Sequence, residues 1–256
     1  MSELLTDRTA VVTGGASGNG RAIARTFAAD GADVVVADVR REPRGGGVPT
    51  DELIQEETER ASRFVNCDVT DIGDLVAAVD AADAFGGIDV MVNNAGIITD
   101  TPFFEISEDE FGQLIDVNVK GVFFGSQVAA ERMLENDGGS IVNVSSTLGI
   151  VGSGSFSLYS ATKGAVTLLT YSLGDELGNQ GVRVNAVHPG TIETEMNVQD
   201  IDVLGSDSGA ELKAGVPLER FGRPEEVADA VAYLASDRAS YVNATSLLVD
   251  GGEVNS

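Results

Sequence analysis

The chain has 256 residues, 43% of them hydrophobic, which is enough for one large domain with a sizeable core and excludes a disordered protein. Its 41 Asp and Glu against 16 Lys and Arg give a formal net charge of −25, which repels phosphates and excludes a nucleic-acid partner. No apolar run approaches a membrane span, no signal-peptide pattern opens the chain, and its one cysteine cannot form an internal disulfide, so we expect a cytoplasmic protein without a membrane partner.

The excess of carboxylates, together with a scarcity of lysine, is similar to the composition of proteins from salt-accumulating halophiles. Concentrated salt shortens the range of charge repulsion to a few ångströms, so such a surface is tolerated there. We therefore predict a halophilic protein. A merely acidic protein from a mesophile is the alternative.

Apolar, strand-like runs alternate with amphipathic stretches along the chain. The predicted strands are Thr9–Thr13, Asp33–Asp38, Phe64–Asn66, Val90–Asn93, Ser140–Ser145, Arg183–Val187 and Ser246–Val249. The predicted helices are Arg21–Asp30, Asp71–Ala84, Glu108–Leu134, Ser157–Gly178 and Pro224–Ala235. This alternation predicts a single α/β domain over residues 1–256, a Rossmann-type doubly wound parallel sheet of about seven strands with helices on both faces. Two polar, glycine-containing segments predict a loop over Arg40–Thr50 and a mobile flap over Glu193–Gly215.

The first predicted strand ends in a glycine-rich turn, from Thr13 to Gly20, that leads into a helix. Glycines at such a turn let the backbone approach a pyrophosphate at the helix N-terminus, where free N–H groups and the helix dipole favour anions. The glycines are spaced G-x-x-x-G-x-G, which differs from the G-x-G-x-x-G fingerprint. The turn nevertheless lies between a predicted strand and a predicted helix, and this arrangement predicts phosphate binding.

Asp38 ends the second predicted strand, 18 residues after Gly20. A carboxylate there can accept hydrogen bonds from both adenosine ribose hydroxyls and repels a 2′-phosphate, which favours NAD over NADP. Arg40 and Arg41 follow closely and provide the alternative, because guanidinium groups bind phosphate.

Tyr159 and Lys163 lie four residues apart in a predicted helix, which places their side chains on one face, one turn apart. The pKa of a free phenol is about 10, too high for proton exchange at neutral pH. A nearby cation favours the phenolate. The pair is therefore a candidate acid/base.

Taken in order, these motifs resemble the classical short-chain dehydrogenase/reductase family, and the resemblance extends from Thr13 to Gly252. It is carried by the Thr13–Gly20 turn, Asn93-Asn94-Ala95-Gly96, Asn118, Ser146, Tyr159-x-x-x-Lys163 and Pro189-Gly190. The resemblance implies NAD-linked interconversion of a secondary alcohol and a ketone, and a homotetramer.

The resemblance also implies four catalytic residues. Tyr159 would exchange a proton with the substrate oxygen, and Ser146 would hydrogen-bond that oxygen. Lys163 would bind the nicotinamide ribose and lower the pKa of Tyr159. Asn118 would hold a water that connects Lys163 to solvent. No metal is expected.

Cofactor contacts implied by the resemblance are assigned by position. Those around pyrophosphate, adenosine and nicotinamide are Gly14, Ser17, Asn19, Gly20, Asp38, Val39, Asp68, Val69, Asn94, Ala95, Gly96, Val117, Tyr159, Lys163, Pro189, Gly190, Ile192 and Thr194. Asn19 replaces the Ile or Leu common in the family. The lone His188 is expected to contribute mainly backbone near the nicotinamide.

Substrate identity is the least determined property. Polar residues expected near the pocket are Ser153, Ser155, Ser157, Glu193, Glu195 and Asn197. They favour a sugar or a 2-keto-3-deoxy sugar acid as substrate. A 3-oxoacyl-thioester reductase is the second hypothesis, although Asp38 and the acidic surface argue against it. A non-catalytic dinucleotide sensor is a third.

Overall fold

A computed structural model describes residues 4–201 and 207–255 and contains one seven-stranded sheet, in which every strand is parallel to its neighbours. The strands are β1 (Thr9–Thr13), β2 (Asp33–Asp38), β3 (Ser62–Asn66), β4 (Val90–Asn93), β5 (Gly139–Val144), β6 (Val182–Pro189) and β7 (Ser246–Val249). Their order across the sheet is β3-β2-β1-β4-β5-β6-β7. The predicted doubly wound fold with seven strands is confirmed.

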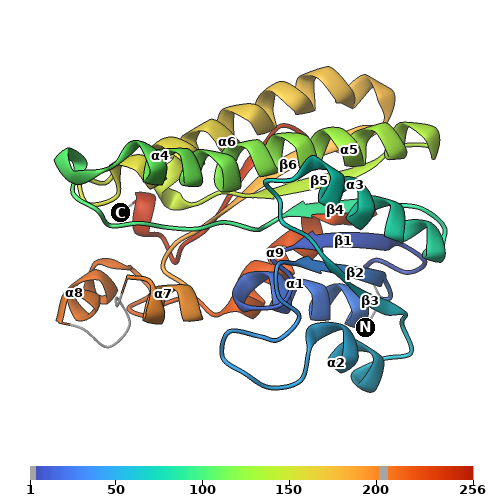
Figure 1. Cartoon of the computed structure of the whole chain (residues 1–256), viewed down its shortest axis with the longest axis horizontal. Helices are drawn as coiled ribbons and strands as arrows, with labels where there is room; N and C mark the ends of the chain where they lie inside the picture. The colour runs from blue at the N-terminus through green and yellow to red at the C-terminus, as the bar shows by residue number, and fades with distance from the viewer. Residues whose placement is uncertain (1–3, 202–206, 256) are drawn as a thin grey trace.

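Helices cover both faces of the sheet (Figure 1). One face carries α1 (Gly18–Ala29), α2 (Thr50–Glu57) and α9 (Pro224–Ala235). The other carries α3 (Ile72–Asp80), α4 (Glu108–Ile115), α5 (Gly121–Glu135) and α6 (Ser157–Leu177). The short helices α7 (Glu195–Gln199) and α8 (Asp207–Gly215) follow β6 and lie to the left of α1 and α9 in Figure 1, with α8 the farther of the two. In the described part of the chain, no helix combines the length and apolarity needed to cross a bilayer.

Alternate residues of β1 divide the core into two layers. Ala10 and Val12 pack with α1 and α9, whereas Val11 faces α3 and α5 on the other side. All five residues of β1 are buried, because side chains of a central parallel strand are covered on both faces. This explains why the strand reads as a continuous apolar run rather than as an alternation.

Several boundaries differ from the prediction. β3 begins two residues earlier than predicted, at Ser62, and β6 extends to Pro189. The helix Thr50–Glu57 was not predicted from the sequence; it begins after Pro49 and has acidic residues in its first turn, a favourable arrangement at the positive end of a helix. The segment predicted as a flap contains two helices, and its residues 202–206 lie outside the described part of the chain.

The order of the strands reverses between β1 and β4, because the chain runs outward from β1 to β3 and then returns to the other side of β1. The connections at the carboxyl ends of β1 and β4 consequently leave in opposite directions. Such a switch point opens a crevice at the edge of the sheet, which is where ligands bind in open α/β folds.

Candidate active site

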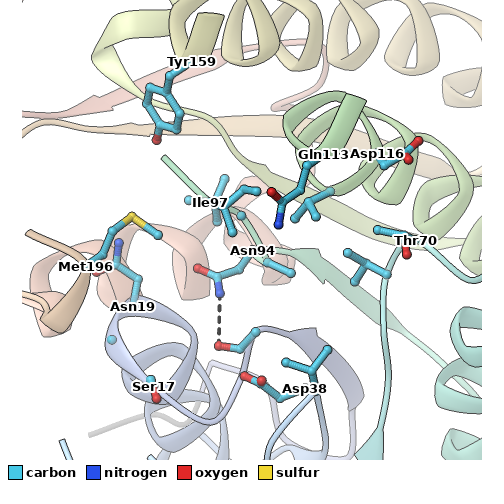
Figure 2. A pocket seen from close by; sticks show the side chains of 18 of the residues that line it. Ser17, Asn19, Asp38, Thr70, Asn94, Ile97, Gln113, Asp116, Tyr159 and Met196 are labelled. Atoms are coloured by element: carbon cyan, nitrogen blue, oxygen red, sulfur yellow. Dashed lines mark hydrogen bonds between the residues drawn. The ribbon is translucent and has the colours of Figure 1, made fainter. Parts of the chain in front are cut away.

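A cavity of about 950 Å³ opens at this crevice. It is lined by residues that follow β1, β2, β4, β5 and β6, together with residues of α4 and α6. Figure 2 shows Tyr159 and Asp38 at opposite ends of this cavity, with Asn94 between them and Met196 at one side. The cavity is therefore elongated, with the candidate acid/base at one end and the candidate ribose-binding carboxylate at the other.

Most of the predicted site residues come together here. Those that line the cavity are Gly14, Ser17, Asn19, Asp38, Val39, Asp68, Val69, Asn94, Ala95, Gly96, Val117, Ser146, Tyr159, Lys163, Pro189 and Thr194. Those that do not are Gly20, Asn118, Gly190 and Ile192. Ile192 instead is buried and forms a bridge with Gly222, so it supports the wall from behind.

Glycines in the turn bring its backbone close to the cavity and to the neighbouring strand end. Gly14 has a φ of +64°, and a Cβ there would lie 2.8 Å from Nδ2 of Asn94. That amide donates a 2.9 Å hydrogen bond to the carbonyl of Thr13, which ties the turn to the end of β4. A Cβ on Gly20 would overlap the carbonyl of Gly14, so α1 can approach the turn closely only with glycine at this position.

Asp38 is held by backbone donors at the adenosine end. Its carboxylate accepts a 3.0 Å hydrogen bond from the N–H of Ala16 and a 3.2 Å bond from that of Arg40. Nearby, Ser17 Oγ accepts a 2.8 Å bond from the N–H of Arg44. The side chain of Arg44 is committed elsewhere, because it forms an ion pair with Asp200, just after α7. This pair joins the loop after β2 to the segment after β6.

Asn118 lies within a π-helical turn, Asp116–Lys120, that joins α4 to α5. π-Turns of this kind are frequent at functional sites. Oδ1 of Asn118 accepts a 2.8 Å bond from the N–H of Ile97, and Nδ2 donates to the carbonyl of Ile97 at 2.8 Å and to Oγ1 of Thr162 at 3.1 Å. Asn118 is fully buried and fastens the loop after β4 to α6 behind the cavity wall.

Tyr159, Ser146 and Lys163 form the other end of the site. The Tyr159 hydroxyl points into the cavity in Figure 2 and is hydrogen-bonded to the Ser146 side chain. Nζ of Lys163 lies 5.7 Å from the centroid of the Tyr159 ring and donates a 2.8 Å bond to the carbonyl of Val144. A Cβ on Gly96 would lie 3.3 Å from Asn118 Oδ1 and 3.5 Å from Lys163 Nζ, so both polar groups converge on that glycine.

The direction of the Tyr159 pKa differs from the expectation. Burial raises the pKa of Tyr159 to about 12, and the hydrogen bond with Ser146 opposes that rise only in part. Burial also lowers the pKa of Lys163 to about 8. The physical reason is that withdrawal from water disfavours the charged form of each group.

The expected polar substrate pocket is not found as predicted. Glu195 lines the cavity, whereas the remaining members of the predicted set do not: Ser153, Ser155, Ser157, Glu193 and Asn197. Asn197 is used internally, since its Nδ2 donates a hydrogen bond to the carbonyl of Ile192. Sequence position alone does not tell which residues of a loop turn inward.

Sequence reasoning missed several residues that line the cavity. Near Tyr159 and the candidate phosphate site these are Ile97, Met196 and Arg44, while Gln113 and Asp116 lie on the α4 side. The signal that could have identified Arg44 was the arginine-rich loop after Asp38. No local signal distinguishes Ile97, Met196 or Gln113 from ordinary packing residues.

The residues present fit an extended dinucleotide. A turn that offers bare backbone at the start of a helix suits a pyrophosphate. Asn19 adds a buried side-chain oxygen without a hydrogen-bond partner in the described structure, and its amide lines the same cavity. A buried polar atom is costly unless a partner satisfies it, so Asn19 is suited to a polar ligand group.

Comparisons with known proteins agree with this geometry. The family model described as "Enoyl-(Acyl carrier protein) reductase" matches residues 14–253. A 3-alpha-(or 20-beta)-hydroxysteroid dehydrogenase of Mycobacterium bovis is 39% identical over 99% of this chain and 92% of that protein. An L-rhamnose 1-dehydrogenase (NAD(P)(+)) of Azotobacter vinelandii is 40% identical over 97% of each.

Solved structures are similar over the whole length. One, provisionally named an NAD(P)-dependent gluconate 5-dehydrogenase, comes from Beutenbergia cavernae and contains NADP at low occupancy. It superimposes with a TM-score of 0.91 and 33% identity, and the match covers 100% of both chains.

Proposed function

The chain belongs to the short-chain dehydrogenase/reductase family, and we propose that it catalyses the reversible, NAD-linked oxidation of a secondary alcohol to a ketone. One observation carries the proposal. The Tyr159 hydroxyl is hydrogen-bonded to Ser146, faces the cavity, and has the Lys163 ammonium one helical turn away. This combination offers a proton donor or acceptor and a second hydrogen-bond donor to a single substrate oxygen.

The chain's own residues bind, orient and move a proton. Ser146 Oγ holds the substrate oxygen, and the Tyr159 hydroxyl exchanges a proton with it. The bound nicotinamide supplies the hydride acceptor or donor. Because its pKa is raised by burial, Tyr159 is protonated at neutral pH and is ready to donate in ketone reduction. In alcohol oxidation it must first lose its proton, which the charge of Lys163 favours.

NAD is the proposed cofactor because of Asp38. Its carboxylate is fixed by two backbone N–H groups at the end of the cavity opposite Tyr159. Two of the three nearby arginines are neutralised, Arg41 by Asp51 and Glu52, and Arg44 by Asp200. A fixed negative charge with few available cations disfavours a 2′-phosphate.

A sugar or sugar acid is the proposed substrate class. Support comes from relatives whose names include L-rhamnose and gluconate dehydrogenases. The steroid dehydrogenase among the relatives points to a more apolar alcohol, and the cavity side chains Ile97 and Met196 are compatible with one. The second candidate is a 3-oxoacyl-thioester reductase. The description of the matching family model shares with it only the acyl-carrier-protein substrate, because it names an enoyl reductase.

A homotetramer is proposed as the assembly. Large apolar side chains are exposed on the outer helices, with Phe123 on α5 at 43% and Leu168 on α6 at 67% exposure. Both helices lie on the same face of the sheet, so these side chains can be covered by a second subunit. Light scattering at several protein concentrations would measure the mass directly.

A substrate panel tests the proposed reaction. It contains aldoses, aldonic and 2-keto-3-deoxy acids, cyclic and steroid alcohols, and acyl thioesters, each assayed with NAD(H) and NADP(H) at low and high KCl. We expect turnover of at least one polyhydroxy substrate with NAD. Turnover restricted to acyl thioesters with NADPH would establish the second candidate instead.

Tyr159→Phe tests the assignment of the acid/base. We expect at least a roughly 100-fold loss of kcat, because the ring remains while the proton is removed. Tyr241→Phe is the matched control, since that side chain is fully exposed. Near-normal turnover in Tyr159→Phe would refute the assignment of Tyr159 as the acid/base. No turnover of any panel member by the wild type would favour a dinucleotide sensor.

A further inference from the structure

His188, the only histidine of the chain, is fully buried near the carboxyl end of β6, directly before Pro189. Both ring nitrogens have partners. Nδ1 lies 2.8 Å from the backbone carbonyl oxygen of Ser146, and Nε2 lies 2.8 Å from Oγ of Ser246 on β7. A histidine that serves only to fill space has no need of two such contacts, and one of these reaches a residue of the site.

The donors in this chain of contacts follow by elimination. A carbonyl oxygen only accepts, so Nδ1 carries the proton and donates to Ser146. In the neutral ring Nε2 then accepts, and the Ser246 hydroxyl must donate to it. Oγ of Ser246 also lies 2.6 Å from the hydroxyl of Tyr171 on α6, and with its own proton committed it accepts from that hydroxyl.

The surroundings favour the neutral ring. Burial lowers the pKa of His188, and the positive charge of Lys163 lowers it further, whereas the bond to the Ser146 carbonyl opposes these effects. The structure thus selects one protonation state and one tautomer, in which Nδ1 rather than Nε2 carries the hydrogen.

The carbonyl that accepts the hydrogen bond from His188 belongs to Ser146, whose side chain is hydrogen-bonded to Tyr159. The same oxygen also accepts a 2.9 Å bond from the N–H of Gly149, so both of its lone pairs are used. On the other side of the residue, Ser146 Oγ accepts a 3.2 Å bond from the N–H of Leu148. A shift of the Ser146–Thr147 peptide would break the contact with His188 and displace the following turn, whose Leu148 N–H holds Oγ.

We propose that His188 is a positioning residue, which holds Ser146 Oγ against Tyr159 by donating from Nδ1 to the Ser146 carbonyl. The proposal rests on the proposed function only in that Ser146 and Tyr159 act on substrate. The series of hydrogen bonds from Tyr171 through Ser246 and His188 ends at the carbonyl oxygen of Ser146, which has no proton to pass on. It therefore orients the site and does not relay protons into it.

The tautomer can be measured without any assay of activity. Protein labelled with 13C and 15N at histidine contains one imidazole, and in a solid-state 13C–15N correlation the carbon Cγ is bonded to Nδ1 alone. At pH 7 we expect a protonated Nδ1 and an unprotonated Nε2. A ring protonated at Nε2 only would overturn the proposal even if the enzyme proves to be an alcohol dehydrogenase.

Two variants test the effect on catalysis. His188→Asn keeps a donor that can reach the Ser146 carbonyl, whereas His188→Leu has none. We expect His188→Leu to lose about 10- to 100-fold in kcat, the cost of a misplaced reacting group, while the Kd for NADH stays within twofold of wild type. His188→Asn should recover most of that loss. The proposed positioning role would be contradicted if His188→Leu and His188→Asn had equal kcat. It would also be contradicted if the affinity for NADH fell in proportion to kcat.

Two further variants separate this role from stability. Ser140→Ala removes a buried hydroxyl-to-carbonyl bond at the opposite end of β5 and should lower Tm without lowering kcat. Ser246→Ala leaves the ring held at one nitrogen only, and we expect about a fivefold fall in kcat, equivalent to one lost hydrogen bond. If His188→Leu does not fold, an unchanged kcat in Ser246→Ala overturns the proposal. Activity retained by Tyr159→Phe would refute the proposed function and leave the tautomer measurement intact.

Discussion

Lys163 lies one helical turn after Tyr159 on α6, with its Nζ 5.7 Å from the centroid of the tyrosine ring. Both groups are withdrawn from water, so the pKa of Lys163 falls to about 8 and that of Tyr159 rises to about 12. In this environment each side chain is destabilised in its charged form. A charge on one therefore has a large effect on the energy of the other, because water screens them poorly.

Lys163→Met is expected to lower kcat for alcohol oxidation by roughly 100-fold at pH 7, since the phenolate of Tyr159 loses its nearest cation. Steady-state kinetics with saturating NAD would measure the loss. Lys213→Met, which removes an exposed lysine of α8, serves as the control for lost charge. A kcat within twofold of wild type in Lys163→Met would show that Tyr159 does not depend on this ammonium.

Stability should respond to alkaline pH through Lys163. Its pKa is about 8 in the folded protein against 10.5 in the unfolded chain, so between these values the unfolded chain binds more protons. The free energy of unfolding contributed by this group therefore rises with pH over that window. Relative to Lys163→Met, wild type should gain roughly 2 kcal/mol between pH 8 and pH 10, as measured by urea unfolding. A constant difference between the two proteins would contradict the lowered pKa.

Gly96→Ala should weaken cofactor binding. The added Cβ would lie 3.3 Å from Asn118 Oδ1 and would enter the wall of the cavity near Lys163. We expect about a tenfold rise in the Kd for NADH, measured by fluorescence titration, because a new methyl group in a close-packed site displaces its neighbours. Gly164→Ala on α6 is the control, since its nearest neighbour is 3.9 Å away. Equal affinity in both variants would exclude a close approach of cofactor to Gly96.

Asp38→Ala should change cofactor preference. Removing the carboxylate eliminates repulsion of a 2′-phosphate and leaves Arg40, an exposed residue that also lines the cavity, to bind it. The ratio of kcat/KM for NADP to that for NAD should rise by roughly 10- to 100-fold. Glu59→Ala changes the net charge by the same amount at a site outside the cavity and should leave the ratio unchanged. If wild type already prefers NADP, the proposed role of Asp38 is wrong.

Salt should stabilise this protein if it functions in a cytoplasm rich in KCl. With a net charge of −25, carboxylates repel one another, and at 1 M salt the screening length falls to about 3 Å. We expect Tm to rise between dilute buffer and molar KCl. Exposed ion pairs such as Arg25–Glu57 act in the opposite direction, but each contributes little to stability. A Tm that is flat or falls across the series would favour an ordinary acidic protein.

Much of the fold was predictable because its signals are local. β1, β2, β4 and β7 lie at their predicted residues, since buried parallel strands are short apolar runs between helices. The long stretch from Glu108 was harder. Its apolar pattern predicts one continuous helix, whereas the structure contains a π-helical turn at Asp116–Lys120. An insertion of that kind depends on what packs against the helix, here the loop at Ile97 and Thr162 of α6.

The sequence by itself determined the family resemblance, the alternation of strands and helices along the chain, and the pairing of Tyr159 with Lys163. These are properties of spacing along one element or one turn. Only the tertiary structure decided that Arg44 is neutralised by Asp200 and that His188 reaches behind the site. Such contacts join segments far apart in the chain, and the pKa of a buried group depends on how completely those segments exclude water.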